Sequence, residues 1–372
     1  MKLTVNKQSF ITAMEKVFPV VPARATLPIL QNVLLKAEGE SLSLTTSDIQ
    51  STVQTTLPAS VARSGATTIP ARRLFNILKE LPSSEIELDT EDKGDLDITV
   101  IRAGASIVKL FGIKQSEFPA PAKVTGVQKF VVSQSLFKTI LDSVHYAASV
   151  DENRKNLQGV LLGFRSGKIF GVATDGRRLA LWEEEFHVDR QQEGEWTIPN
   201  DAVRELLALL GEEGDLRILI SDTNLVFEGP DFKLISQMLM EKFPNFRQAI
   251  PAGSDVRVSV ARDELLGALR RASILLSGHE GSVSLSLSDN CLEISTPENE
   301  AGEYREKIAV KHSGPSISIL LNAEWLMDPL RNLSSDEVFL ELSGSYSPCV
   351  IKTDKPFLYV LMPMRPTTTA TR

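Results

Sequence analysis

The feature that most constrains the fold of this chain is an internal repeat, which recurs three times along its 372 residues. Each copy begins with a short apolar strand pattern and an amphipathic stretch, and successive copies start about 125 residues apart. A second strand-and-helix block follows about 65 residues into each copy. The first blocks begin at Leu3, Phe130 and Val258, and the second blocks begin at Thr68, Thr197 and Ile319. The sequence therefore predicts three similar domains.

Local patterns predict the elements of each copy. Alternating apolar residues around a Gly or Asn predict β-hairpins over 33–44, 160–171 and 283–294. Apolar residues at helical spacing predict helices over 6–17, 70–80, 133–145, 199–210, 261–275 and 322–333. We expect side-chain caps at four helix starts, from Asn6, Ser133, Asn200 and Asn322. Pro329 is expected to kink or shorten the last helix.

The fold class that follows is α+β, with three repeated domains that each have two helices backed by antiparallel sheet. Proline-rich segments, 118–122 and 243–253, are typical of linkers between such domains. The predicted domains are residues 1–122, 128–250 and 255–372, the last of which includes a C-terminal tail.

Composition limits the function classes. The formal charge is −8, which at first argues against a nucleic-acid partner, because such partners usually have a basic domain. However, the six predicted helices carry a slightly positive sum, so the acidic residues are concentrated on strands and loops. The helices are either ordinary solvated surfaces or one mildly positive wall on one side of a sheet.

Other features indicate a cytosolic protein without a cofactor. Cys291 and Cys349 are too few for a disulfide framework or a four-cysteine zinc site, and structural thiols are favoured over a redox role. The N-terminus resembles a strand and has no signal core, and no apolar run reaches the ~18 residues of a membrane span. We expect no metal, no cofactor and no membrane partner.

Catalytic motifs are missing from the sequence. It contains no phosphate loop, dinucleotide fingerprint, metalloprotease helix or nucleophile elbow, and its four histidines are scattered. An enzyme hypothesis would take Asp175 as a base beside Arg177 and Arg178. The alternative is that Asp175 and Gly176 form a tight turn, which the lack of a second catalytic group favours.

Five segments, in order along the whole chain, resemble a known family. They are 26–30 (TLPIL), 66–72 (ATTIPAR), 173–180 (ATDGRRLA), 243–246 (FPNF) and 360–365 (VLMPMR). Together with the threefold repeat, they are similar to the bacterial DNA polymerase III beta subunit, the sliding clamp. The resemblance implies a ring-shaped, head-to-tail homodimer that encircles duplex DNA without reading its sequence. The expected protein partners are the polymerase III alpha subunit, the clamp loader, and other polymerases and repair proteins, which bind through short hydrophobic peptide motifs.

The resemblance also implies where those motifs bind. It predicts a groove between the second and third domains, with these residues: Leu157, Thr174, Gly176, Arg177, Arg178, Leu179, Pro244, Pro348, Val360, Met362, Pro363, Met364 and Arg365. Met is adaptable and suits a surface that serves several partners, although core packing is an alternative for Met362 and Met364. Arg177, Gln248 and Ala249 depart from residues that are common at these positions in the family. The tail from Pro366 to Arg372 extends past the family's usual end, and we expect it to leave the groove open.

The resemblance implies contacts with DNA and with a second chain. The predicted DNA contacts are Arg24, Arg72, Arg73, Arg154, Lys155 and Asn156, which would meet phosphates rather than stack on bases. The predicted dimer contacts are Ile107, Val108 and Leu110 on one edge and Ile274 and Leu275 on the other, with ordinary core positions as the alternative. A non-catalytic repeat scaffold for protein binding is the second functional hypothesis.

Overall fold

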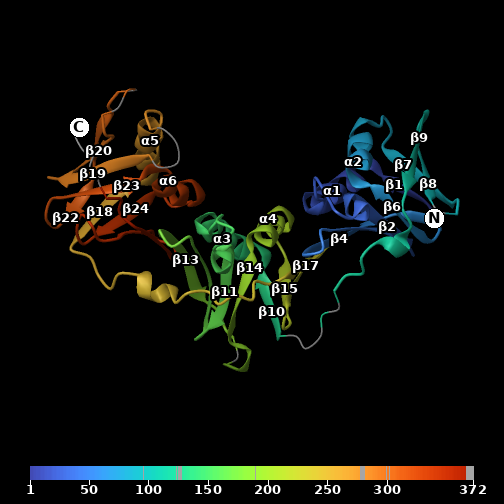
Figure 1. The fold of residues 1–372 in the computed structure, drawn as a ribbon, viewed down its shortest axis with the longest axis horizontal. Helices are drawn as coiled ribbons and strands as arrows, with labels where there is room; N and C mark the ends of the chain where they lie inside the picture. Colours follow the sequence, from blue (N-terminus) through green and yellow to red (C-terminus); the bar gives the residue numbers. More distant parts are fainter. Residues whose placement is uncertain are drawn as a thin grey trace. The chain divides into compact units, whose positions relative to one another are not determined.

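The computed structural model describes residues 1–94, 96–122, 124, 128–188, 190–276, 281–298, 300 and 302–365 (Figure 1). The chain forms two compact units. One unit contains residues 1–138 and 201–238, and the other contains residues 139–200 and 239–372. The boundary between the units therefore runs through the central copy of the repeat.

The three copies of the repeat share one plan, in which a strand leads into each of two helices, although the central copy has four strands between its helices and the other two copies have five. The first copy contains β1 (Lys2–Asn6), α1 (Lys7–Val17), β2 (Asn32–Glu38), β3 (Ser41–Ser47), β4 (Ser51–Pro58), β5 (Ser60–Arg63), β6 (Gly65–Pro70), α2 (Ala71–Glu80), β7 (Glu85–Asp92), β8 (Asp97–Ala103) and β9 (Ser106–Gly112). The central copy contains β10 (Gln128–Ser133), α3 (Gln134–Val144), β11 (Gly159–Arg165), β12 (Lys168–Thr174), β13 (Arg178–Glu185), β14 (Gly194–Pro199), α4 (Asn200–Leu209), β15 (Asp215–Ile220), β16 (Asn224–Glu228) and β17 (Phe232–Gln237).

The third copy contains β18 (Val256–Ala261), α5 (Arg262–Ser273), β19 (Ser282–Ser288), β20 (Cys291–Ser295), β21 (Arg305–Ala309), β22 (Lys311–Ser313), β23 (Ile317–Asn322), α6 (Ala323–Asn332), β24 (Glu337–Leu342), β25 (Cys349–Lys352) and β26 (Phe357–Leu361). Short 3-10 turns complete the chain, at η1 (Phe18–Val20), η2 (Pro28–Gln31), η3 (Gln115–Glu117), η4 (His145–Ala147), η5 (Lys155–Leu157), η6 (Arg190–Gln192) and η7 (Phe246–Ala249). The predicted repeat, its six helices and its three hairpins are confirmed.

Most predicted helix caps are present. The Asn6 side chain accepts from the Ser9 amide at 3.0 Å, the Asn322 side chain accepts from the Trp325 amide at 3.0 Å, and the Ser133 hydroxyl accepts from the Leu136 amide at 3.3 Å. The prediction for Asn200 is wrong, because Asn200 is already the first helical residue and its side-chain amide donates to the Ser149 carbonyl.

Pro329 does not end the last helix. Helix α6 continues through Pro329 to Asn332, so the predicted shortening is wrong. Proline has no amide hydrogen and cannot bond to the carbonyl four residues earlier, which belongs to Trp325. The Tyr359 hydroxyl donates to that carbonyl at 2.8 Å and replaces the missing donor.

The strands join into four sheets, and two of the sheets cross from one copy of the repeat to the next. The eight-stranded sheet has the order β10-β15-β16-β17-β4-β3-β2-β6, and the pairing of β17 with β4 connects the central copy to the first. The nine-stranded sheet has the order β14-β11-β12-β13-β26-β25-β24-β18-β22, and the pairing of β13 with β26 connects the central copy to the third.

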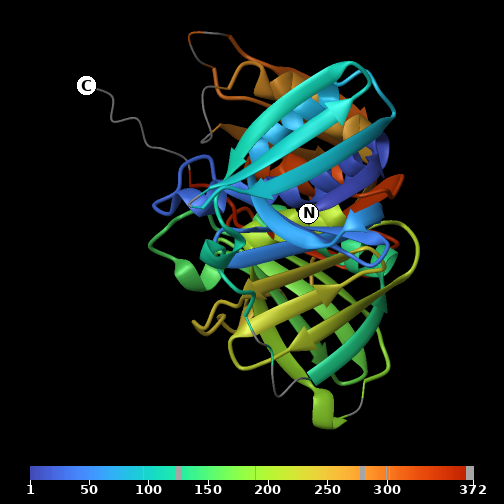
Figure 2. The ribbon, with the colours of Figure 1, turned by 90° about the vertical axis from the view of Figure 1, so that its right-hand side faces the viewer.

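The other two sheets are half as wide. The first copy alone forms a five-stranded sheet, β5-β1-β7-β8-β9, whose long strands β7 to β9 are visible in cyan in Figure 2. The third copy alone forms a four-stranded sheet, β21-β20-β19-β23. In the first and third copies the two helices pack on strands of the same unit through fully buried side chains such as Phe10, Leu74 and Leu326.

Three general observations bear on function. No helix in the described residues is long and apolar enough to cross a membrane. Within the same part of the chain, no group of three or more His, Cys, Asp or Glu side chains could hold a metal ion. Cys291 and Cys349 are free thiols, and burial raises the pKa of the Cys349 thiol to about 12.

Candidate functional site

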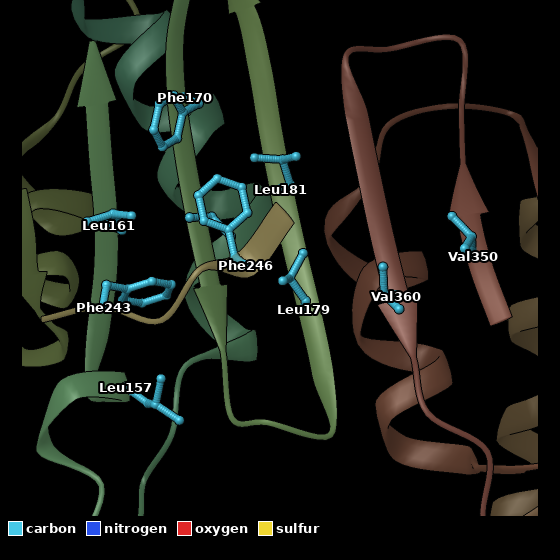
Figure 3. Close-up of a cluster of buried hydrophobic side chains, with 10 residues drawn as sticks. Leu157, Leu161, Phe170, Leu179, Leu181, Phe243, Phe246, Val350 and Val360 are labelled. Atoms are coloured by element: carbon cyan, nitrogen blue, oxygen red, sulfur yellow. The ribbon is translucent and has the colours of Figure 1, made fainter. Parts of the chain in front are cut away.

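An apolar cluster forms where the central copy meets the third copy within one unit. The pairing of β13 with β26 sets Leu179 opposite Val360. The chain segment that leads from the central copy to the third adds Phe243 and Phe246 to the cluster (Figure 3). The full cluster is Leu157, Leu161, Phe170, Val172, Leu179, Leu181, Phe243, Phe246, Val350 and Val360. The structure thus brings together three predicted groove residues, Leu157, Leu179 and Val360.

A tight turn between β12 and β13 borders this cluster. The Asp175 carboxylate accepts from the amides of Arg177 at 2.9 Å and Arg178 at 3.0 Å, and the Thr174 hydroxyl accepts from the Gly176 amide at 3.1 Å. Gly176 has a φ of +85°, a conformation that favours glycine. The second oxygen of Asp175 accepts from Arg178 Nε at 2.9 Å. Asp175 is therefore a turn residue, and both of its oxygens have partners, which disfavours the catalytic base of the enzyme hypothesis.

A cavity of about 330 Å³ lies beside this turn. It is lined by Arg177, Asn322, Trp325, Met362, Pro363, Met364 and Arg365. The C-terminal segment is held there by its backbone, because the Met362 amide donates to the Arg177 carbonyl at 2.9 Å and the Met364 amide donates to the Leu320 carbonyl at 2.8 Å. Met362 is 44% exposed, so core packing does not describe this residue.

Sequence reasoning missed two walls of the cavity, Asn322 and Trp325. Both belong to the start of α6, where Asn322 caps the helix by accepting from the Trp325 amide. The Arg177 guanidinium lies 5.7 Å from the centre of the Trp325 ring, within the range of a cation–π contact. The cap was recognisable in the sequence, but the meeting of α6 with Arg177 depends on strand pairing between copies that are distant in the chain.

The remaining predicted groove residues lie around the apolar cluster. Pro244 is exposed between Phe243 and Phe246, which anchor its segment, and half-buried Pro348 precedes β25. The neighbouring Arg247 stacks over Phe246, with its guanidinium carbon 5.0 Å from the ring centre, and pairs with Glu183 at 2.5 Å. This pair fixes the segment that carries Gln248 and Ala249, both of which are exposed. The tail residues 366–372 lie outside the described residues.

The predicted DNA contacts lie in both units. Arg24, Arg72 and Arg73 are exposed in the first unit, and the Arg72 guanidinium lies 5.3 Å from the Phe18 ring centre. Arg154, Lys155 and Asn156 lie on the loop before β11 in the second unit. Arg154 donates to the Asp175 carbonyl at 2.8 Å, so this side chain supports the turn beside the groove.

The predicted dimer contacts lie on sheet edges and at a helix end. On edge strand β9, Ile107 is 64% exposed, Val108 is half-buried and Leu110 is buried against the sheet. Exposed Phe111, which the sequence analysis did not select, lies on the same edge strand. Ile274 is 78% exposed just after α5, and Leu275 beside it is half-buried.

Comparison with known proteins agrees with this geometry. Family models for the DNA polymerase III beta subunit match the chain in three parts: the N-terminal domain at residues 1–122, the central domain at 131–245 and the C-terminal domain at 247–365. A beta sliding clamp from Pseudomonas aeruginosa is 30% identical over 370 residues, which cover 98% of this chain and 100% of the relative. One from Chlamydia pneumoniae is 29% identical over 365 residues, which cover 98% of this chain and 99% of the relative.

Solved structures are similar over the same length. The Pseudomonas aeruginosa sliding clamp bound to griselimycin has a TM-score of 0.93 at 30% identity and covers 98% of this chain and 99% of its own. The sliding clamp from Bartonella birtlesii bound to griselimycin has a TM-score of 0.91 at 31% identity, with 98% and 99% coverage.

The repeated domains and their sheet-and-helix layers define the class of DNA clamps, in which three such domains form one chain. The shared domains, sequence and fold all lead to one family. The chain belongs to the DNA polymerase III beta subunit family. It is a sliding clamp, a non-catalytic processivity factor of DNA polymerase III.

Proposed function

We propose that two chains of this protein close head to tail into a ring around duplex DNA. Strand β9 of one chain pairs with β21 of the other chain. The observation that carries this proposal is the pattern of sheet junctions. Strands β17 and β26 are the last strands of the second and third copies of the repeat. Strand β17 pairs with β4 and β26 pairs with β13, and β4 and β13 are each the third strand after the first helix of their copy. The corresponding strands that remain are β9, the last strand of the first copy, and β21, the third strand after the first helix of the third copy. Both are edge strands of the described sheets.

Pairing β9 with β21 would complete the pattern. The five-stranded and four-stranded sheets would merge into one sheet as wide as the nine-stranded sheet that the chain already forms. An unpaired edge strand with exposed apolar side chains favours association with another strand. The proposed contacts are Ile107, Val108, Leu110, Ile274 and Leu275. Leu110 is buried, so it would support the conformation of β9 and would not touch the second chain directly.

The proposed DNA contact is weak and independent of base sequence. Arg24, Arg72, Arg73, Arg154, Lys155 and Asn156 offer basic or polar side chains for phosphates, and the whole chain carries a charge of −8. A negative chain with a few basic contacts suits a protein that holds DNA by enclosure, since strong phosphate binding would oppose sliding. Such a protein acts in the cytoplasm, where bacterial DNA is replicated.

The groove is the proposed docking site for partner peptides. Its residues are Leu157, Thr174, Gly176, Arg177, Arg178, Leu179, Pro244, Pro348, Val360, Met362, Pro363, Met364 and Arg365, to which the geometry adds Asn322 and Trp325. A cavity lined by two methionines, a tryptophan and two arginines, next to the buried apolar cluster, suits a short peptide with hydrophobic anchors. The proposed partners are the polymerase III alpha subunit, the clamp loader, and other polymerases and repair proteins.

We also propose that the three domains span residues 1–122, 128–250 and 255–372. The chain between β9 and β10 and the chain between β17 and β18 contain short turns but no strands within the described residues, which supports linkers there. The linker after β17 has a second role in the proposal, because its Phe243 and Phe246 form one side of the groove.

Two experiments test the proposal. The first loads the protein on nicked circular DNA with a clamp loader and follows its release after the circle is cut. We expect retention on the circle and rapid loss from the linear form. A repeat scaffold that does not close into a ring would be lost equally from both, and a solution mass of one chain under all conditions would contradict ring closure.

The second experiment measures the affinity of a fluorescent peptide from the polymerase alpha subunit for the wild type and for Met364→Ala. Truncating a side chain that lines the cavity should weaken binding about tenfold. Tyr346→Ala is a matched control, because Tyr346 is a large, exposed side chain that does not line the cavity. Equal binding by wild type and Met364→Ala would remove Met364 from the docking site.

A further inference from the structure

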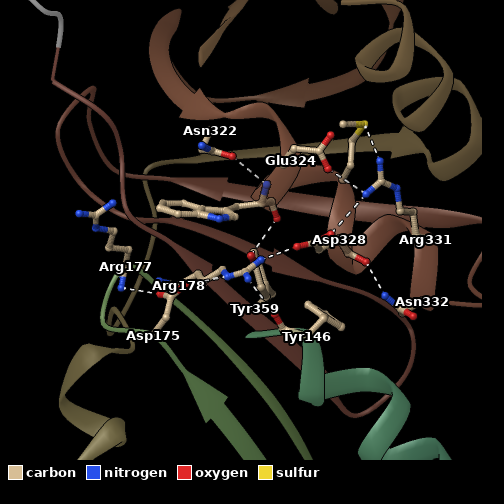
Figure 4. A network of polar contacts seen from close by, with 12 residues as sticks. Tyr146, Asp175, Arg177, Arg178, Asn322, Glu324, Asp328, Arg331, Asn332 and Tyr359 are labelled. Carbon is tan, nitrogen blue, oxygen red and sulfur yellow. Dashed lines mark hydrogen bonds and ion pairs between the residues drawn. The ribbon is translucent and has the colours of Figure 1, made fainter. Parts of the chain in front are cut away.

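The side chain of Arg178 joins the turn beside the groove to helix α6. Its guanidinium is largely buried, with 11% of the side chain exposed. Nε donates to Asp175 at 2.9 Å, Nη2 donates to the Tyr146 carbonyl at 2.7 Å, and Nη1 donates to Asp328 (Figure 4). The first two acceptors belong to the central copy of the repeat, whereas Asp328 belongs to α6 of the third copy.

Asp328 lies one helical turn after Trp325 on α6. The Trp325 ring contacts both arginines of the turn, since its centre lies 5.5 Å from the Arg178 guanidinium and 5.7 Å from the Arg177 guanidinium. The two walls of the cavity that face each other, Arg177 and Trp325, are therefore each within three residues of one partner of the Arg178–Asp328 ion pair. The position of α6 relative to the turn sets how wide this end of the groove is.

We propose that Asp328 is a positioning residue for peptide docking, which holds Trp325 opposite Arg177 through its ion pair with Arg178. This inference rests on the proposed docking function of the groove. Asp328 does not line the cavity, so its effect on a peptide is exerted through α6.

The chemistry of the pair supports a strong effect. When a buried guanidinium loses one carboxylate partner, it keeps its charge and is left with an N–H donor that has no acceptor. This loss is costly in a site with little water. Without Asp328, Arg178 keeps both of its acceptors in the central copy, Asp175 and the Tyr146 carbonyl. Its remaining contact with α6 is then the stacking on Trp325, which has no fixed direction comparable to a charge-assisted hydrogen bond.

Helix α6 offers a matched control. Glu324 pairs with Arg331 at 3.0 Å, and Asp328 also pairs with Arg331 at 3.4 Å, so both variants remove a partner of Arg331. The Glu324 side chain is 43% exposed, and Arg331 does not border the cavity. Glu324→Gln and Asp328→Asn remove the same charge from the same helix. A difference in peptide affinity between these two variants is therefore due to the position of Asp328 and not to the net charge of α6.

The test uses the full chain and a fluorescent peptide from the polymerase alpha subunit, with Asp328→Ala, Asp328→Asn and Glu324→Gln. We expect the dissociation constant to rise about tenfold for Asp328→Ala, about threefold for Asp328→Asn, which keeps one acceptor oxygen, and less than twofold for Glu324→Gln. Sedimentation should give all variants the mass of the wild type.

A spectroscopic measurement separates positioning from general loss of stability. In a background with Trp182→Phe and Trp196→Phe, the emission of Trp325 can be quenched by acrylamide without peptide. Quenching should increase for Asp328→Asn, which keeps the size of the side chain, and stay unchanged for Glu324→Gln. Unchanged quenching and a peptide affinity within twofold of the wild type would overturn the positioning role. If the wild type itself fails to bind the peptide, the docking function fails as well.

Discussion

The Tyr359 hydroxyl donates a hydrogen bond of 2.8 Å to the Trp325 carbonyl, and this bond lets a helix contain a proline. Pro329 removes the amide that would otherwise bond to this carbonyl. Tyr359 is fully buried on β26, and burial raises the pKa of its hydroxyl well above the ordinary value, so it keeps the proton that it donates.

Tyr359→Phe should therefore lower the free energy of unfolding by about 1–3 kcal/mol, because it leaves the partly buried Trp325 carbonyl with one bond fewer. In a Pro329→Ala background the new amide can bond to Trp325, so the same substitution should cost less. Urea unfolding of the four proteins in this double-mutant cycle measures the coupling. Equal costs in the two backgrounds would show that Tyr359 does not replace the helical donor.

Glu205 should make stability depend on pH. Burial raises the pKa of the Glu205 carboxyl to about 8, and the nearby Asp48 and Asp201 carboxylates add to the rise. Between about pH 5 and pH 8 the unfolded chain loses this proton and the folded chain keeps it, so stability falls as pH rises, by up to about 1.4 kcal/mol per pH unit. Above this range both states are ionised and the slope ends.

The measurement is urea unfolding from pH 5 to 9 for wild type and Glu205→Gln, with Glu40→Gln as an exposed control. The free energy of unfolding of the wild type should fall relative to that of Glu205→Gln as pH rises. A constant difference would mean that Glu205 is ionised in the folded protein throughout.

Gly176→Ala should weaken both the turn and peptide docking. Its φ of +85° costs an alanine about 1–2 kcal/mol. An added Cβ would also lie 2.9 Å from Arg154 Nη1, and this flexible side chain would have to release its bond to the Asp175 carbonyl. Isothermal titration with the polymerase peptide should show weaker binding than Gly39→Ala, a control that also has a positive φ but has open space around it.

Ile107→Glu should reduce dimer formation, because it buries a charge at the proposed junction of β9 and β21. Val131→Glu is the matched control, since Val131 is also an exposed apolar residue on an edge strand, β10, outside the proposed junction. Sedimentation equilibrium over a range of protein concentrations gives the dissociation constant. Equal dimerisation of the two variants would argue against β9 as the interface.

Arg24→Ala combined with Arg73→Ala should weaken DNA binding and flatten its salt dependence. Two lost phosphate contacts lower the slope of log K against log salt by about 1.8. Fluorescence anisotropy with a short duplex at several salt concentrations measures this slope. The control is Arg63→Ala, which removes an arginine that pairs with Asp89 at 2.9 Å.

The sequence predicts what depends on neighbours along the chain. Helical spacing, the Asn6 and Asn322 caps and the hairpins at Gly39, Gly167 and Asn290 are local, and each has a counterpart in the structure. Two local predictions were wrong, the Asn200 cap and the shortening of α6 at Pro329, because Ser149 and Tyr359, which are distant in the sequence, form hydrogen bonds there. A local pattern carries no information about such a partner.

The groove shows the same limit more clearly. The resemblance to a known family supplied Met362 and Arg177, but Trp325 and Asp328 come from a helix that meets them through the pairing of β13 with β26. The strand order between copies of a repeat depends on which edge strands pair with each other, and these strands are distant in the sequence. Neither hydrophobic periodicity nor composition encodes that order.

The two edges left by the sheet pattern, β9 and β21, are different from each other, and this has a genetic consequence. A chain with a damaged β21 edge still offers an intact β9 edge to a normal chain, so the mixed pair could join at one end and stay open at the other. Cells that express both forms would lose normal subunits to such open pairs. Edge mutations are therefore expected to be dominant, whereas mutations in the groove are expected to be recessive.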